Sequence, residues 1–225
     1  MPRRKTPLVT GEIYHVFNRG VARTNIFSGK RSYERMLDCL WYYRFRDPPL
    51  KLSHFLALSK DAQREVVERL RETRETIVEV YSFCLMPNHF HLLLSQTIDG
   101  GISDFMRKAV NSYSTYFNVL QERIGPLLQG VFQAVRVESD EQLIHVSRYI
   151  HRNPWIGHVI KRNDLRSFPW SSLPDYLESK SGTFITKERI LSYFSSPLKY
   201  EKFVMDESEI DIRESQEVFR HLFLE

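Results

Sequence analysis

The stretch 84–94 has the sequence CLMPNHFHLLL and contains two histidines, His89 and His91, separated by one residue. Successive side chains of a β-strand point to opposite faces, so a strand here would present both imidazoles on one face and turn Phe90 into the core. Two imidazoles side by side on a rigid strand form half of a divalent-metal site. The pair is also compatible with a partly buried strand edge, so the metal interpretation needs a third ligand and a reactive group from another element.

The segments around this stretch predict strands and helices in a definite order. Apolar alternation favours strands, and Pro87 suits the beginning of one, where a missing N–H is tolerated. Helical spacing of apolar residues after the N-cap candidates Ser59 and Ser103 favours helices. The predicted elements are a strand at 12–18, a helix at 31–46, a charged helix at about 59–75, strands at 77–85 and 89–95, a helix at 102–124, a strand at 131–138 and a helix at 141–152 that stops near Asn153-Pro154.

This order predicts an α+β fold of the ferredoxin-like type. We expect an antiparallel sheet with helices on one face and the histidine strand in a central position. The charged helix at about 59–75 has a thin apolar face and is taken as an insertion that leans on the domain. Residues 1–155 then form one domain, and residues 156–225 form a mostly helical C-terminal extension with an acidic tail.

The composition is that of an ordinary globular protein. The 225 residues carry a net charge of +4 and a pI near 9.0, which is only mildly basic and does not by itself indicate nucleic-acid binding. No apolar run approaches the ~20 residues that a membrane helix needs. The basic N-terminus lacks the apolar core of a signal peptide, and Cys39 and Cys84 have apolar neighbours, as reduced core residues do. These features predict a cytoplasmic protein without membrane contact.

The helix predicted at 141–152 ends in a second group of polar residues. Tyr149 and Asn153 are four positions apart and share a helix face, with His145 one turn earlier and Arg148 and Arg152 beside it. A tyrosine, an amide and two arginines at one helix end are unusual for a purely structural surface. Taken alone, Tyr149 as packed core and Asn153 as a helix C-cap before proline are the more ordinary interpretation.

Together the two groups resemble a known family. The sequence MPNHFHLLL, followed by RYIHRNP at 148–154, resembles the single-tyrosine HUH transposases of the insertion-sequence-200-like family, most closely the REP-associated tyrosine transposases. Further matches in the family's order, over about residues 11–176, are YHV at 14–16, NRG at 18–20, NSY at 111–113, QG at 129–130 with Phe132, and FPWSS at 168–172. The resemblance implies a metal-binding histidine pair on a central strand and a nucleophilic tyrosine on a helix beside it.

The activity that the resemblance implies is that of a metal-dependent single-stranded DNA endonuclease and strand transferase. His89, His91 and, by the family's pattern, Asn153 would hold a Mg²⁺ or Mn²⁺ ion that polarises the scissile phosphate. Tyr149 would form a 5′-phosphotyrosine bond and leave a free 3′-OH, without any need for ATP. The expected partner is single-stranded DNA with hairpins of the repeated extragenic palindrome kind. A monomer is favoured, and a dimer stays open.

Several further residues are candidates for supporting roles. His145 could assist Tyr149 as a base or a neighbouring group. The candidates for DNA contacts, each of which could equally be an ordinary surface or core residue, are Arg148, Arg152, Arg107, Lys108 and His15. Where the family often carries basic residues, this chain has Val131 and Gln133, which puts DNA contacts from that segment in doubt.

Two other functions stay open. The first is a metallohydrolase in which the histidine pair activates water and Tyr149 is structural. The second is a non-catalytic single-stranded nucleic-acid-binding protein, since related sheets in RNA-binding domains display stacking aromatics. The chain has no aromatic-rich strand of that kind, which argues against the second alternative.

Overall fold

A computed structural model describes residues 7–73, 75–177 and 184–206. Its centre is an antiparallel sheet in the order β2-β3-β1-β4, and the histidine strand β3 lies between β2 and β1. This order is that of a ferredoxin-like fold, so the predicted α+β class is confirmed. The strands are β1 (Ile13–Arg19), β2 (Val78–Met86), β3 (His89–Gln96) and the short edge strand β4 (Gln133–Arg136), and a 3₁₀ turn, η1 (Val21–Arg23), follows β1.

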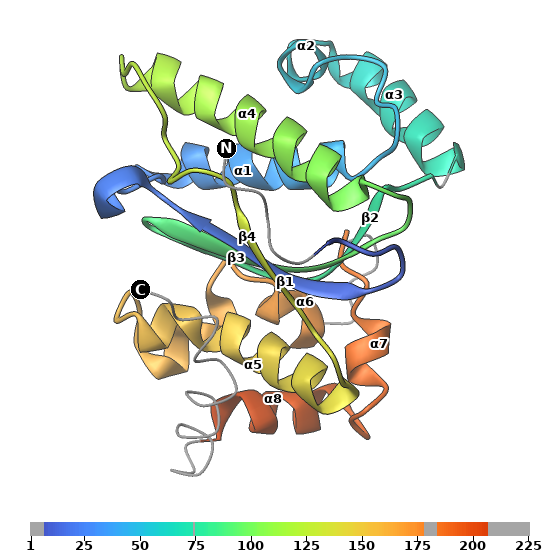
Figure 1. Ribbon diagram of the computed structural model, residues 1–225, viewed down its shortest axis with the longest axis vertical. Helices are drawn as coiled ribbons and strands as arrows, with labels where there is room; N and C mark the ends of the chain where they lie inside the picture. Colours follow the sequence, from blue (N-terminus) through green and yellow to red (C-terminus); the bar gives the residue numbers. More distant parts are fainter. Residues whose placement is uncertain (1–6, 74, 178–183, 207–225) are drawn as a thin grey trace.

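Two helices cover one face of the sheet. Helices α1 (Lys30–Tyr43) and α4 (Gly101–Leu120) pack next to each other above the strands (Figure 1). Phe90 and Leu92, which alternate with the histidines along β3, are fully buried, and strand alternation assigns them to this face. The core beneath α1 and α4 therefore holds the apolar side of the histidine strand.

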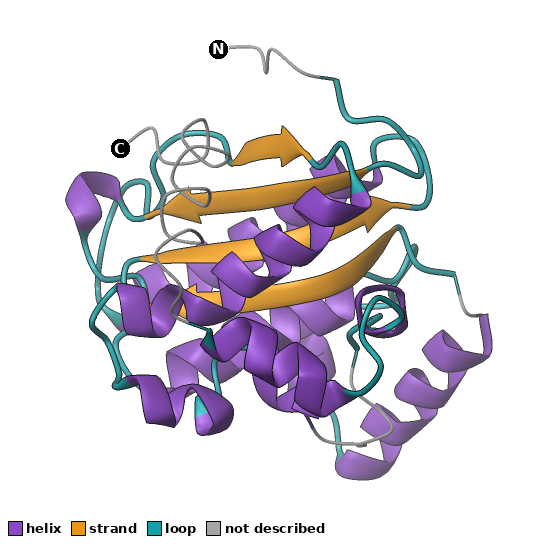
Figure 2. Ribbon diagram, turned by 90° about the horizontal axis from the view of Figure 1, so that it is seen from below, coloured by secondary structure: helices purple, strands orange, loops and turns teal. Residues whose placement is uncertain are grey.

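A second helical layer covers the other face. It consists of α5 (Asp140–Ile156) and the C-terminal elements η2 (Arg162–Ser167), α6 (Leu173–Leu177), α7 (Glu188–Leu191) and α8 (Pro197–Met205). Figure 2, seen from this side, shows helices lying across the strands. The expectation of helices on one face thus holds for α1 and α4, and helix periodicity alone did not predict that α5 and the extension would pack on the opposite face.

Helix α5 continues through Asn153-Pro154, where the sequence predicted its end. It begins at a serine cap, where Ser139 Oγ accepts a hydrogen bond from the Gln142 N–H at 3.1 Å, and runs to Ile156. A proline inside a helix removes one backbone hydrogen bond, and the residue before it usually avoids the α region. Residues 146–154 are all buried, so packing on both sides of α5 outweighs this local preference.

The insertion before β2 contains two helices, α2 (Leu52–Leu56) and α3 (Lys60–Thr73). Ser59 Oγ accepts a hydrogen bond from the Ala62 N–H at 3.3 Å, as expected for an N-cap. In α3 only Leu70 is buried, so the predicted thin apolar face is confirmed. None of the described helices is long and apolar enough to cross a membrane. The acidic tail from Glu207 onward lies outside the described residues.

Candidate active site

Strand β3 places His89 and His91 on the sheet face that α5 covers. Their ring centroids lie 4.9 Å apart and the rings are nearly perpendicular, at 89°. In the register of the sheet His91 is opposite Phe17 of β1 and His89 is opposite Arg19, at the end where β2 and β3 join. His91 is 5% exposed, whereas His89 is half-buried. The structure therefore brings the two imidazoles together, with one of them open to solvent.

Helix α5 lays Tyr149 against this pair. The ring of Tyr149 meets His91 edge-on, with centroids 5.5 Å apart and an interplanar angle of 83°. It also meets His15 of β1 edge-on, with centroids 5.9 Å apart. Tyr149 is 9% exposed, so its ring packs between the helix and the two central strands. Residues that are 58 positions apart in the sequence, His91 and Tyr149, are thus neighbours in the fold.

Asn153 follows Tyr149 by one helical turn, and its side chain is held by the same helix. The amide Nδ2 of Asn153 donates a hydrogen bond to the carbonyl oxygen of Tyr149 at 3.2 Å. Because the amide nitrogen is engaged in this way, Oδ1 is the atom that could act as a ligand for a hard cation. The continuation of α5 through Pro154 keeps Asn153 in the helical frame of Tyr149.

His15, a candidate for a DNA contact, lies in the interior of the protein. It is 1% exposed, and its Nε2 lies 2.9 Å from Nδ1 of His91. The two rings are stacked, with centroids 5.0 Å apart. The first strand therefore contributes a histidine that touches the histidine pair and does not reach the surface.

Both histidines of the pair are engaged through Nδ1. His91 shares its Nδ1 with His15, and His89 has its Nδ1 2.6 Å from Oδ1 of Asn88. Nε2 is the nitrogen that each ring would offer to a metal, and such support of the second ring nitrogen is usual for histidine ligands. Nothing in the sequence pattern singled out Asn88. Its position directly before His89 is the only signal of this role.

The site keeps the imidazoles of His15 and His91 neutral and offers a mixed set of donors. Burial lowers the pKa of His15 to about 3, and burial, together with the neighbouring His15 and His89, lowers the pKa of His91. Neutral imidazole is the form that binds metals. Within the described residues no three His, Cys, Asp or Glu side chains gather to hold an ion. Two imidazole nitrogens and the amide oxygen of Asn153 are a donor set that fits a divalent cation such as Mn²⁺ or Mg²⁺.

The arginines of α5 are buried, in contrast to the surface contacts expected of them. Arg148 is 2% exposed, its Nη2 donates to the carbonyl oxygen of Asp206 at 2.7 Å, and its guanidinium lies 4.6 Å from the ring centroid of Phe203 in α8. Arg152 is also buried, with its guanidinium 4.9 Å from the ring centroid of Trp155. Arg148 thus lies in the packing between α5 and the C-terminal extension, and Arg152 packs on α5 itself; phosphate contacts by either residue stay a prediction.

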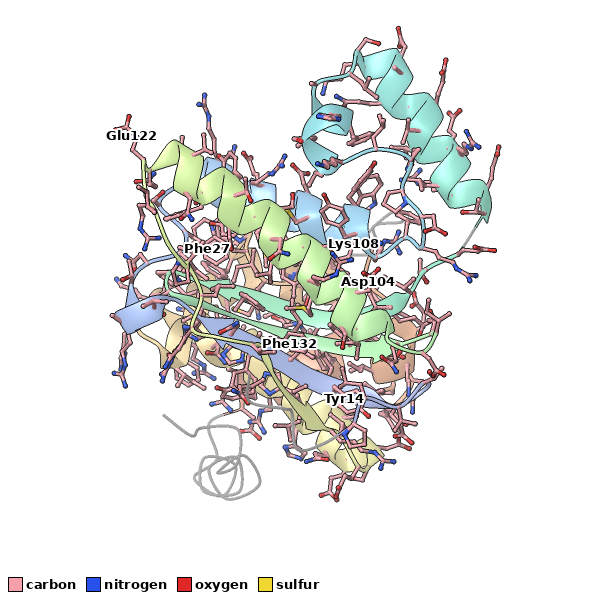
Figure 3. All side chains as sticks on the ribbon, turned by 45° about the horizontal axis from the view of Figure 1, so that its top comes forward. Tyr14, Phe27, Asp104, Lys108, Glu122 and Phe132 are labelled. Carbon is pink, nitrogen blue, oxygen red and sulfur yellow. The ribbon has the colours of Figure 1, made fainter. Side chains whose placement is uncertain are left out.

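His145 packs against the C-terminal extension, and the two basic residues of α4 lie on the opposite face of the sheet from α5. The ring of His145 packs edge-on against Phe203 of α8, with centroids 5.3 Å apart. Arg107 and Lys108 both form ion pairs with Asp104, and Figure 3 shows Asp104 and Lys108 on α4. Because α4 covers the opposite face of the sheet, the structure does not bring Arg107 and Lys108 to the site.

Comparison with known proteins relates the chain to a family model and to solved structures. Residues 55–153, which include both histidines of the pair, Tyr149 and Asn153, match the family model of IS200-like transposases. A solved structure of a REP-associated tyrosine transposase bound to a REP hairpin is similar in fold, with a TM-score of 0.55 and 13% identity over 82% of this chain and 90% of that chain. No curated protein matches the sequence.

Proposed function

We propose that the chain is a metal-dependent single-stranded DNA endonuclease and strand transferase that acts through Tyr149, on the basis of the match of residues 55–153 to the family model of IS200-like transposases. That match supports an enzyme of the transposase class. The observation that carries the finer proposal is the edge-on contact between Tyr149 and His91, at 5.5 Å between centroids. It supports a nucleophile beside a metal ligand, a pairing that a purely structural tyrosine does not require.

The residues that would hold the metal are His89, His91 and Asn153, through Nε2 of each imidazole and Oδ1 of the amide. When bound, Mg²⁺ or Mn²⁺ supplies a Lewis acid that polarises a phosphate oxygen and offsets the charge that develops on it. The protein's part is to present oriented imidazoles, and the Nδ1 contacts of His91 and His89 support that role.

Tyr149 carries the covalent step. Its Oη attacks phosphorus and loses its proton, a new P–O bond forms, and the bond from phosphorus to the 3′ oxygen breaks. The leaving 3′ oxygen keeps the bonding electron pair and takes up a proton, so that one DNA end carries a 5′-phosphotyrosine bond and the other a 3′-OH. A later attack by a 3′-OH reverses the step. Strand transfer therefore needs no ATP, because the phosphodiester bond energy is conserved in the intermediate.

The proposed substrate is single-stranded DNA that contains a hairpin, bound by a monomer of the chain. Support comes from the REP-associated transposase of similar fold, whose structure holds a REP hairpin. The sheet face next to His89, which is the more open residue of the pair, is where we place the scissile phosphate. Arg148 and Arg152, the candidates for phosphate contacts on α5, are both buried in the described structure.

The test is to incubate the full chain and Mn²⁺ with single-stranded hairpin DNA from its own genomic neighbourhood. We expect a protein–DNA adduct that survives denaturant and is absent from Tyr149→Phe. Tyr193→Phe is a matched control, because Tyr193 is an exposed tyrosine outside the site. Cleavage that persists in Tyr149→Phe without an adduct would favour the metallohydrolase. Hairpin binding without any cleavage in the wild-type chain would favour the non-catalytic binding protein.

A further inference from the structure

The hydrogen bond between His15 and His91 has a consequence for metal binding that no sequence motif contains. It joins Nε2 of His15 to Nδ1 of His91 at 2.9 Å, across the two central strands. In the register His15 is opposite Leu93, so it lies diagonally next to His91 on the same sheet face. The contact is therefore fixed by the pairing of β1 with β3.

The pair must share a single proton in that contact. If His91 donates from Nδ1, its Nε2 keeps a lone pair and is able to bind a metal. If His15 donates from Nε2, a neutral His91 carries its own proton on Nε2, and that nitrogen is then unable to bind a metal. The direction of this one hydrogen bond thus decides whether His91 is competent as a ligand.

The surroundings of Nδ1, the other ring nitrogen of His15, indicate which of the two residues donates the hydrogen bond in the metal-free protein. Nδ1 of His15 is buried and, in the described part of the chain, has no hydrogen-bond partner. In the metal-competent arrangement His15 accepts through Nε2 and carries its proton on Nδ1, so a buried N–H is left without an acceptor. In the reverse arrangement Nδ1 is only an unpaired acceptor, which folded proteins bury more readily than an unpaired N–H. The free protein therefore favours the arrangement in which His15 donates, and a bound ion favours the reverse.

We propose that His15 is a positioning residue for the metal site, which accepts the Nδ1–H of His91 when a divalent ion binds and so fixes Nε2 of His91 as the ligand nitrogen. This inference rests on the proposed role of His91 as a metal ligand. His15 itself does not touch the ion or the DNA. No net proton is released by the pair, because one proton leaves Nε2 of His91 and one is taken up on Nδ1 of His15.

The experiment measures Mn²⁺ affinity by titration calorimetry in the full chain without DNA. We expect His15→Phe, which keeps a buried ring but cannot accept a hydrogen bond, to weaken Mn²⁺ binding about 10- to 100-fold. His15→Gln supplies an amide oxygen in place of Nε2 and should recover most of the loss. His54→Gln, at an exposed histidine of α2, is the matched control and should bind Mn²⁺ as the wild-type chain does.

A spectroscopic measurement separates this role from simple packing. Long-range ¹⁵N–¹H spectra of the imidazoles should show the proton of His91 moving from Nε2 to Nδ1 when Mg²⁺ is added, and no such change in His15→Phe. Wild-type affinity in a folded His15→Phe variant, or an unchanged His91 tautomer on metal binding, would overturn the proposal. If the wild-type chain itself binds no Mn²⁺, the proposed metal site fails, which is a different outcome. If His15→Phe does not fold, the Mn²⁺ affinity of His15→Gln and the His91 tautomer in the wild-type spectra still test the proposal.

Discussion

Nε2 of His151 lies 2.8 Å from Oγ of Ser172, and the same hydroxyl accepts a hydrogen bond from the backbone N–H of Phe83 at 2.9 Å. The other ring nitrogen of His151, Nδ1, lies 2.7 Å from the hydroxyl of Tyr200 in α8. His151 thus connects α5 with β2 on one side and with the C-terminal extension on the other. The helix that carries Tyr149 is held in place by this buried network.

Ser172→Ala should lower the free energy of unfolding by about 1–3 kcal/mol, because it leaves the Phe83 N–H and one nitrogen of His151 buried without their partner. Urea unfolding followed by circular dichroism measures this change. Ser192→Ala is the control, since the Ser192 hydroxyl is exposed and bonds only a local carbonyl. Equal midpoints for the two variants would show that the network does not stabilise the fold.

Phe90→Ala should cost about 3–5 kcal/mol of stability, as expected for removal of a fully buried aromatic ring. Phe90→Leu should cost clearly less, because it refills most of the volume. Chemical denaturation of both variants gives the comparison. Because Phe90 anchors β3 between the two histidines, the alanine variant should also bind Mn²⁺ more weakly. Undiminished Mn²⁺ affinity in a folded Phe90→Ala variant would show that the histidine pair does not depend on this anchor.

Both cysteines should be unreactive in the native protein at pH 8. Burial raises the pKa of Cys39 to about 12 and raises the pKa of Cys84 well above its usual value. The reactive thiolate is therefore scarce below pH 9, and the reagent also cannot reach buried sulfur atoms. A colorimetric thiol reagent should detect almost no reaction in buffer and two thiols after denaturation. Rapid reaction of either thiol without unfolding would contradict the buried positions.

Mn²⁺ should raise the midpoint of thermal unfolding, because an ion that binds only the folded chain stabilises it by about 2.7 kcal/mol at a hundred times its dissociation constant. Excess EDTA should return the midpoint to the metal-free value. In His91→Ala the shift should vanish, whereas His54→Gln should keep it. A shift of the same size in His91→Ala would place the ion somewhere other than the histidine pair.

Much of the fold was predictable, because its local signals agree with its tertiary packing. Alternation in β3 and the Ser59 cap of α3 both led to the observed elements. The end of α5 was predicted wrongly, since the rule that stops a helix before Pro154 is local and the burial of residues 146–154 comes from distant segments. The second helical layer could not be predicted, because periodicity shows that a helix has an apolar side but not which sheet face it meets.

The placement of the candidate site was predictable only in part. Strand alternation was sufficient to put His89 and His91 together, and the resemblance suggested Tyr149 and Asn153. The burial of Arg148 and of His15 could not be predicted from the sequence, because the position of each residue depends on contacts between segments that are far apart in the chain. A charged or titratable residue next to a motif looks the same in a sequence whether it points outward or inward. Only the packing of α5 against α8 and of β1 against β3 distinguishes the two cases.

The buried hydrogen-bond network around His151 also sets an order in which the site can be completed during synthesis. The two histidines belong to a hairpin of neighbouring strands, and Tyr149 follows within the next sixty residues. The hydroxyls that hold α5, those of Ser172 and Tyr200, leave the ribosome after Tyr149 itself. A nascent or truncated chain that ends before Ser172 therefore contains every proposed catalytic group. It still lacks the two hydroxyls that hold the helix of Tyr149 in place. On the proposed role of Tyr149, the order of the sequence alone would therefore disfavour DNA cleavage by unfinished chains.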